Sequence, residues 1–174
     1  MRNIVKHDGT IMADAWQLLE RPAEGDSLTL PEGPCLVPAE LWLAGHEHFA
    51  GNDRIGLWLD SHEEPELIAE HIHQLPLVAV NFPKFSDGRG YSTARLLRER
   101  FGYQGELRAI GDVLLDQLQF MKRCGFDSYA LRPDKDINKA PRCLNVFSNP
   151  YQAATDNDEP LFRRRGEFPV AATA

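Results

Sequence analysis

LPLVAVNF at residues 75–82 and ELRAIGD at residues 106–112 are two apolar runs of strand length. Between them, STARLLRERFG at residues 92–102 has its apolar side chains at helical spacing and ends at Gly102. A strand, a helix and a second strand in this order predict a crossover between parallel strands. Because LPLVAV is apolar on both faces, we expect this strand to lie in a sheet covered by helices.

The same alternation extends in both directions from this unit. Further runs of strand length lie at 35–38, 54–60 and 126–132, and helical patterns lie at 39–50, 65–75 and 113–125. A last helix is expected within 134–152, where Pro141 and Pro150 interrupt the pattern. The sequence therefore predicts an α/β fold with a mainly parallel sheet of four to five strands. The sheet is either half-barrel-like or open with helices on its faces, and the sequence does not decide between these forms.

The first 34 residues lie outside this rhythm. Residues 1–20 predict a hairpin because Asp8-Gly9 is a strong turn signal between short apolar runs. Residues 21–34 contain three prolines and two glycines and predict a loop. A chain of 174 residues has the size of one domain. We therefore expect a single α/β domain at 1–165 with a flexible tail at 166–174.

Composition and charge exclude several classes of protein. Apolar residues make up 43% of the chain and charged residues 26%, which is a globular balance. The net charge of −7 disfavours nucleic-acid binding, which depends on neutralising phosphates. No apolar run approaches the ~20 residues that cross a bilayer, and the first residues show no apolar signal region. We therefore expect a cytoplasmic protein with no membrane partner.

Three cysteines and two His-x-His pairs are the side chains with the strongest metal-binding chemistry: Cys35, Cys124, Cys143, His46, His48, His71 and His73. The cysteine count is odd and no pair has CxxC spacing, which argues against disulfides and zinc ribbons. Histidines two apart on a helix point to different faces, so neither pair is a good chelator. We expect no metal site, and we interpret the cysteines as small core residues in a reducing compartment.

The richest loop for chemistry runs from Phe82 to Ser92, from a strand end to a helix start. In a parallel sheet the strand ends share one edge, where ligands commonly bind. Lys84, Arg89, Ser92 and the free amides of the helix start suit a small anion, with Asp87 beside them. In the alternative interpretation, Asp87-Gly88 is only a turn and Arg89 pairs with a nearby acid.

Two further strand ends bring Asp112 and Arg132 to the same edge. Asp112 could orient the cations or act as an acid or base, or it could simply cap the helix at 113–125. Arg132 could bind an anion, or it could form a salt bridge with Asp134 or Asp136. We predict that the edge is locally positive and favours an anion held by the helix start at Ser92.

A basic run near the end of the chain reverses the overall charge. Arg163, Arg164 and Arg165 follow Leu161 and Phe162. These arginines are either a solvated charge run or a docking surface for an acidic partner or a neighbouring subunit. An exposed sheet edge in a half-barrel would also favour a homodimer.

The string FPKFSDGRGYSTARLLRERFGYQGELRAIGDVLLDQLQFMKRCGFDSYALR, residues 82–132, resembles the core of a bacterial family of unknown function. The resemblance begins near Arg54 and extends to DGTIMADAWQLL (8–19) and YQAATDNDEPLFRRR (151–165). Within 133–150, Pro141 and Pro150 interrupt what is a smoother helix in the family. Members are commonly encoded beside assimilatory sulfite reductase and are often labelled oxidoreductases of sulfite reduction.

The resemblance implies a role in sulfur assimilation and assigns no catalytic residue. We expect no cofactor, because no flavin or nicotinamide motif is present and three cysteines are too few for an iron–sulfur cluster. The first hypothesis is an accessory protein that assists sulfite reductase or its electron donor. The second is an enzyme or binding protein for a small anionic metabolite at the strand-end edge. The third is a sensing or structural module without chemistry.

Overall fold

The computed structural model describes residues 3–23 and 29–164, and within them eight strands form one sheet. The strands are β1 (Asn3–Lys6), β2 (Ile11–Ala13), β3 (Gln17–Leu18), β4 (Cys35–Pro38), β5 (Ile55–Leu59), β6 (Leu77–Phe82), β7 (Glu106–Gly111) and β8 (Ser128–Tyr129). Their order is β2-β1-β8-β7-β6-β5-β4-β3. Neighbours from β3 to β8 are parallel, and β1 is antiparallel to β2 and β8. The prediction of a mainly parallel α/β sheet is confirmed, with more strands than expected.

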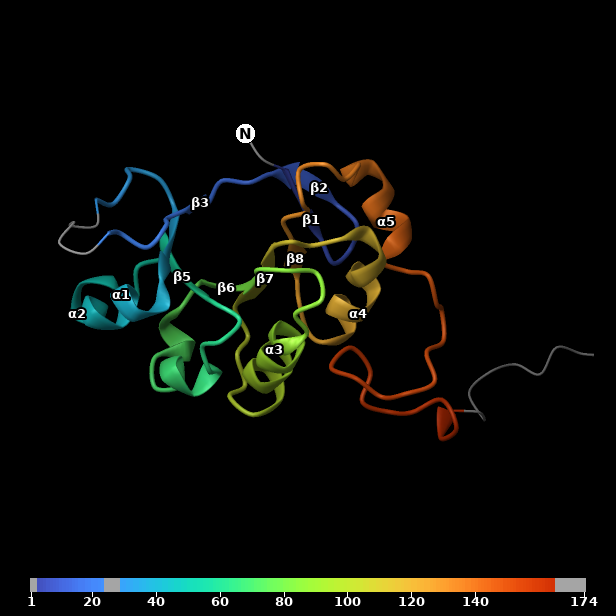
Figure 1. Ribbon diagram of the computed structural model, residues 1–174. Coiled ribbons are helices and arrows are strands. Elements are labelled where there is room, and N and C mark those ends of the chain that lie inside the picture. Colours follow the sequence, from blue (N-terminus) through green and yellow to red (C-terminus); the bar gives the residue numbers. More distant parts are fainter. Residues whose placement is uncertain (1–2, 24–28, 165–174) are drawn as a thin grey trace, which may run out of the picture.

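The helices pack against one face of this sheet (Figure 1). They are α1 (Ala39–Ala44), α2 (His46–Phe49), α3 (Arg89–Glu99), α4 (Leu118–Arg123) and α5 (Ala140–Cys143), with 3₁₀ turns η1 (Pro65–Ile68), η2 (Ile72–Gln74), η3 (Leu115–Gln117) and η4 (Ile137–Lys139). Alternate strand residues such as Leu57, Val78 and Leu107 enter the main core with Trp42 of α1 and Leu97 of α3. This burial, at about 25 cal/mol per Å² of apolar surface, fixes the register of the parallel strands.

A three-residue connection forces the sheet to curl. β2 and β3 lie at opposite ends of the strand order, yet only residues 14–16 separate them along the chain. Eight strands spaced ~4.8 Å apart would hold these edges about 34 Å apart in a flat sheet. The four Cα steps from Ala13 to Gln17 reach at most about 14 Å. The sheet therefore bends into an open half-barrel, and the connection crosses its concave face (Figure 1). Of the two predicted forms, the half-barrel is the one observed.

An arginine is buried on that concave face. Arg108 of β7 is 2% exposed, and its guanidinium donates to Asp14 Oδ1 at 2.6 Å and to Glu106 Oε1 at 2.8 Å. Its Nε also donates to Ser128 Oγ at 3.1 Å. Lys6 Nζ lies 2.6 Å from the second oxygen of Glu106. These contacts tie β1, β7 and β8 to the connection at Asp14, and they satisfy a cation that would be very costly to bury alone.

Apolar side chains fill the rest of the concave face. Trp16 and Trp58 pack against a second buried cluster made of Ile4, Leu36, Leu77, Ala79, Ile110 and Ala130. Trp58 Nε1 donates to the carbonyl oxygen of Leu19 at 2.9 Å, so the chain just after β3 is also held down. The connection thus covers the concave face of the sheet, against which no helix packs in the described residues.

Within the predicted span of 1–20, residues 3–13 form the hairpin, whereas Gln17 and Leu18 pair with β4 instead. β1 and β2 pair antiparallel, with Asn3 opposite Ala13, and the turn between them places Gly9 at φ 92°. This left-handed conformation favours glycine.

The helix start expected at Ser92 and the cap considered for Asp112 are not observed. α3 begins at Arg89, so Ser92 lies within the helix and does not cap it. The early start brings Gly90 against the Phe82 ring, where a Cβ atom would come within 2.7 Å of the ring. Asp112 does not cap the helix after β7 either, because that segment begins only at η3. The amide of Leu114 there donates to the side chain of Gln117 at 3.0 Å.

Other predicted elements are shorter than expected. Residues 65–75 form η1 and η2 instead of one α-helix, and Leu75, which precedes Pro76, is extended at φ −95° and ψ 122°. The expected helix within 134–152 is limited to η4 and α5, and the strand predicted at 126–132 pairs only at 128–129. The tail predicted at 166–174 lies outside the described residues. Within 3–23 and 29–164, no helix has the length and hydropathy needed to cross a bilayer.

The concave network predicts a specific acid sensitivity. Burial alone would raise the pKa of Glu106, but hydrogen bonds from Lys6 and Ser128 and the charge of Arg108 lower it from 4.5 to about 2. Glu106 therefore stabilises the fold above the unfolded-state pKa, and this stabilisation is lost as the pH falls toward 2. We predict a loss of about 3 kcal/mol from this group, measured by urea unfolding between about pH 5 and about pH 2.

Glu106→Gln should remove this part of the pH dependence. Glu47→Gln on exposed α2 is the control and should leave the slope of stability against pH unchanged. An unchanged slope in Glu106→Gln would contradict the role given to this network.

Candidate functional site

The parallel strands β5 to β8 end at one edge of the sheet, which we call the C-terminal edge. Five predicted site residues follow these strand ends: Lys84, Asp87, Arg89, Asp112 and Arg132. The structure brings them together as two separate pairs, with Lys84 apart from both.

The first pair joins Asp87 to Arg89. Arg89 Nε donates to Asp87 Oδ1 at 2.9 Å, and Nη2 donates to Asp87 Oδ2 at 2.6 Å. The same Nη2 lies 2.9 Å from the hydroxyl of Ser61, a buried residue just after β5. The Arg89 guanidinium holds the pKa of Asp87 well below its usual range. Arg89 thus pairs with a nearby acid, as the alternative interpretation of this loop predicted.

The second pair joins Asp112 to Arg132 across neighbouring strand ends. Arg132 Nη1 donates to Asp112 Oδ1 at 2.8 Å, and its Nε donates to Asp134 Oδ1 at 2.6 Å. The second oxygen of Asp112 accepts the amide of Phe85 at 2.9 Å. Asp112 therefore fixes the loop after β6 as well as the arginine after β8. The Asp134 salt bridge is the structural alternative considered for Arg132.

A glycine makes this arrangement possible. Gly111 ends β7 at φ 92°, and a Cβ atom there would lie 2.4 Å from the carbonyl oxygen of Phe82. The bend lets the Asp112 amide donate to that same oxygen at 2.7 Å. β6 and β7 are therefore tied together directly beneath the Asp112 carboxylate.

Lys84 and Ser92 do not join either pair. Both are exposed, and within the described residues Lys84 has no carboxylate partner. Because carboxylates of the same chain neutralise Arg89 and Arg132, the positive charge expected for an anion is largely compensated at this edge. A cavity of about 500 Å³ beside Arg89 and Ser92 is lined by the loop at 61–66, including three glutamates.

Sequence reasoning missed a third cluster at this edge. Asn81 Nδ2 donates to Asp60 Oδ1 at 3.1 Å, and the Asp60 amide donates to Glu63 Oε2 at 2.6 Å. Arg21, from the predicted loop at 21–34, lies 2.8 Å from Glu63 Oε1. Asp60 could have been predicted as an edge residue, because it directly follows the apolar run of β5. No local sequence pattern indicated that Arg21 would join it.

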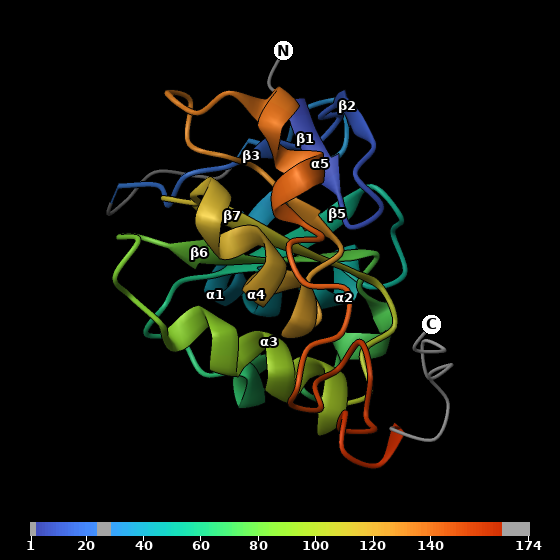
Figure 2. The same ribbon diagram turned by 90° about the vertical axis from the view of Figure 1, so that its right-hand side faces the viewer.

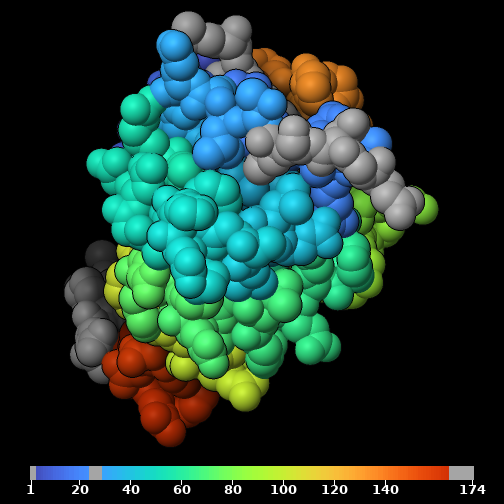
Figure 3. Space-filling view, turned by 90° about the vertical axis from the view of Figure 1, so that its left-hand side faces the viewer, coloured from blue at the N-terminus to red at the C-terminus, as the bar shows by residue number. Residues whose placement is uncertain are grey.

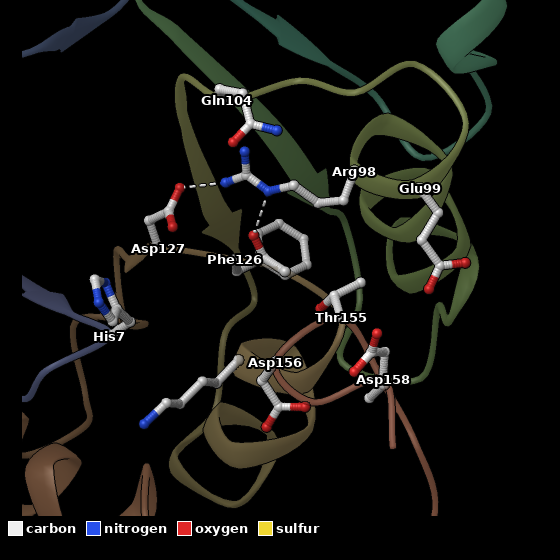
Figure 4. Close-up of a pocket in the computed structure, with 12 residues that line it drawn as sticks. His7, Arg98, Glu99, Gln104, Phe126, Asp127, Thr155, Asp156 and Asp158 are labelled. Atoms are coloured by element: carbon white, nitrogen blue, oxygen red, sulfur yellow. Dashed lines mark hydrogen bonds and ion pairs between the residues drawn. The ribbon is translucent and has the colours of Figure 1, made fainter. Parts of the chain in front are cut away.

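A cleft of about 580 Å³ lies at the opposite edge of the sheet (Figure 4). Arg98 of α3 points at Asp127 on one wall, while Asp156 and Asp158 lie on the other side. Arg98 also donates to the carbonyl oxygens of Tyr103 at 2.5 Å, Gly105 at 3.0 Å and Gly125 at 2.9 Å. All of these contacts are internal, so Arg98 holds the chain before β7 and β8 and has little capacity left for a ligand.

Histidines and acids do not assemble a metal site in the described part of the chain. No group of three His, Cys, Asp or Glu side chains is placed to hold an ion there. One histidine from each predicted pair meets the other: the rings of His46 and His71 are 4.8 Å apart between centroids. His71 also lies against buried Trp42, which is a packing contact on the helical side of the sheet.

The chain after α5 runs along α4 and α3 (Figure 2). The amide and the hydroxyl of Thr155 both donate to the carbonyl oxygen of Arg123, at 3.2 and 2.6 Å, which ties this segment to the end of α4. Arg163 lies over the Phe162 ring at 5.9 Å. Arg164 lines a hollow beside α4, and Arg165 lies outside the described residues.

Large apolar side chains on this side of the molecule remain exposed. Five of them are more than half exposed, and we call them the aromatic surface: Phe120, Val146, Phe147, Tyr151 and Phe162. Gln119 Nε2 donates to the carbonyl oxygen of Phe147 at 3.3 Å, which keeps that segment beside α4. Single exposed apolar residues are common, but a group of this size in one region is typical of an interaction surface.

Substitutions at the C-terminal edge should show which of its residues stabilise the fold. Asp112→Ala leaves the Phe85 amide and Nη1 of Arg132 without their acceptor, so we predict a loss of about 1–3 kcal/mol in the free energy of unfolding. Lys84→Ala, the matched control on the same edge, should change it by less than about 0.5 kcal/mol. Urea unfolding measures both values, and equal effects would show that Asp112 does not hold the edge together.

The sequence that forms this site matches one protein-family model. The model described as "Bacterial protein of unknown function (DUF934)" matches residues 56–162. No match was found among curated proteins or among solved structures. The matched region begins in β5 and includes the aromatic surface, the cleft except for His7, and the C-terminal edge except for Arg21. Since it covers more than half of the chain, the protein belongs to the DUF934 family of bacterial proteins.

Proposed function

We propose that this protein is an accessory protein of assimilatory sulfite reduction that binds sulfite reductase or the protein that supplies its electrons. The pathway is suggested by the resemblance of residues 82–132 to a family encoded beside sulfite reductase. A binding role is supported by the aromatic surface on α4 and the chain after α5. This surface is the single observation that carries the proposal, because each large apolar side chain buried in a complex contributes about 1.5–3 kcal/mol.

The location of the surface also suits a docking role. Seen from the side of α1 and α2, the end of the described chain projects beyond the rest of the molecule (Figure 3). Phe162 is exposed there, and its ring lies 6.5 Å from that of Tyr151. The segment thus presents aromatic side chains where a large partner can reach them.

The second hypothesis, a small anionic metabolite at the C-terminal edge, has less support. An anion would have to compete with Asp87 for Arg89, and with Asp112 and Asp134 for Arg132. Charge-assisted, bidentate pairs of this kind are among the stronger polar contacts in proteins. A role as an oxidoreductase rests on the family label alone.

The accessory role is tested by direct binding. The full chain is mixed at micromolar concentration with sulfite reductase and, separately, with its electron donor, and complex formation is followed by sedimentation velocity. We predict a complex with one of the two proteins. If neither protein forms a complex with the chain, the proposal is wrong. Normal growth of a deletion strain on sulfate as the only sulfur source would also overturn it.

Matched variants locate the contact. Phe147→Ala should weaken the complex about tenfold or more, because exposed aromatic residues often dominate interfaces. Leu67→Ala is the control, since Leu67 is an exposed apolar residue on η1, which packs beside α3 rather than α4. Equal affinities for the two variants would place the contact elsewhere.

A further inference from the structure

A basic hollow borders the aromatic surface at Phe147. It has a volume of about 320 Å³ between α4 and residues 144–157, with Phe147 among the residues that line it. Three cations and one carboxylate contribute to its lining: Lys122, Arg123, Arg164 and Asp156. In a chain with a net charge of −7, this is a local reversal of sign.

Two of these cations are only partly compensated by their own chain. Lys122 Nζ donates to the neutral amide oxygen of Asn145 at 2.9 Å, and it has no carboxylate partner within the described residues. Arg123 Nε is 3.6 Å from Asp156 Oδ1, beyond hydrogen-bond distance, and this buried atom has no hydrogen-bond acceptor among the residues described. The cations of the C-terminal edge differ, because Arg89 and Arg132 have close carboxylates.

More cations without a carboxylate partner, among the described residues, flank this region: Lys139, Arg142 and Arg163. Lys139 and Arg142 belong to η4 and α5, which pack next to α4, and Arg163 follows Phe162. The exposed acids near this region along the chain are Asp116, Asp136, Asp156, Asp158 and Glu159, of which Asp156 lines the hollow. The cations are therefore grouped beside exposed aromatic side chains, an arrangement that fits a partner carrying both acidic and apolar groups.

We propose that the hollow binds a carboxylate from an acidic segment of the protein partner, with Phe147 contacting an apolar side chain beside it. This inference rests on the proposed function for the existence of a partner, and it adds the chemistry of the partner's surface. Lys122 Nζ donates to the incoming carboxylate, and the charge of Arg123, whose nearest carboxylate is Asp156 at 3.6 Å, attracts it from the same wall of the hollow. Nucleic acid is disfavoured as the occupant because the chain as a whole repels phosphates.

The hollow can be tested without knowing the partner. A synthetic peptide of alternating glutamate and phenylalanine is titrated into the ¹⁵N-labelled full chain, and a lysine–phenylalanine peptide of equal length serves as the charge control. We predict saturable shifts of the Lys122, Asn145 and Phe147 amide signals with the acidic peptide only. Raising the salt concentration from about 0.05 M to about 0.5 M should weaken binding, because the contact is partly electrostatic.

Charge-reversal variants separate this site from general attraction. Lys122→Glu should weaken binding of the acidic peptide at least about tenfold, and Lys122→Gln should weaken it less. Arg54→Glu, the control, makes the same change of net charge at an exposed cation before β5 and should leave binding unchanged. Equal effects of Lys122→Glu and Arg54→Glu, or equal binding of both peptides, would overturn the proposal.

The two proposals fail in different ways. If the acidic peptide binds at Lys122 but sulfite reductase and its donor do not bind the chain, the hollow stands and the accessory function is wrong. If a complex forms but survives Lys122→Glu and Phe147→Ala, the accessory function stands and the hollow is not its contact.

Discussion

The short connection between β2 and β3 constrains the whole molecule. It joins the two outer strands of an eight-stranded sheet with three residues, so the strands between them have to curl. The contact that anchors it is the pair between Asp14 and buried Arg108. Arg108 in turn holds Glu106 and Ser128, and Glu106 is also paired with Lys6 of β1. The hairpin, the connection and the last parallel strand are thus joined through one guanidinium.

The curl places the helices on the convex side and separates two kinds of charged surface. At the C-terminal edge, acids and arginines from successive strand ends pair with each other and fix the loops. Beside α4, several cations have no carboxylate partner in the described chain and lie among exposed aromatic residues. The edge is where ligands bind in many parallel sheets, but here its polar groups are largely satisfied internally. Our proposal therefore assigns partner binding to the surface formed by α4 and the chain that follows α5.

The strands could be predicted because their physical signal is local. Runs such as LPLVAVNF are apolar on both faces, which few other structures tolerate, and the Asp8-Gly9 turn needs only its own backbone. Helix ends were harder, because α3 starts early where Gly90 meets the ring of Phe82 from the preceding strand. The choice between a cap and a partner for the cations stayed open for Asp112, because its partners, Phe85 and Arg132, are far away in sequence. Such contacts depend on tertiary structure and leave no pattern in a single sequence.

Part of the buried network around Arg108 could have been predicted from the sequence. It stands inside an apolar strand with Glu106 two residues before it, and residues two apart on a strand share a face. A charged pair on one face of a buried strand predicts a compensated interior network. Its third member, Asp14, was not predictable, because the sequence does not reveal that the chain after the hairpin crosses the concave face.

The role of this buried pair in closing the half-barrel can be measured most directly by a double-mutant cycle. The free energies of urea unfolding are compared for the wild type, Asp14→Ala, Arg108→Ala and the double variant. We predict a coupling energy of about 2 kcal/mol or more, because removing Asp14 takes one of two close carboxylates from the buried Arg108, and removing Arg108 takes the cation from the largely buried Asp14. Effects that add to within about 0.5 kcal/mol would contradict the claim that the Asp14–Arg108 pair holds the connection in place.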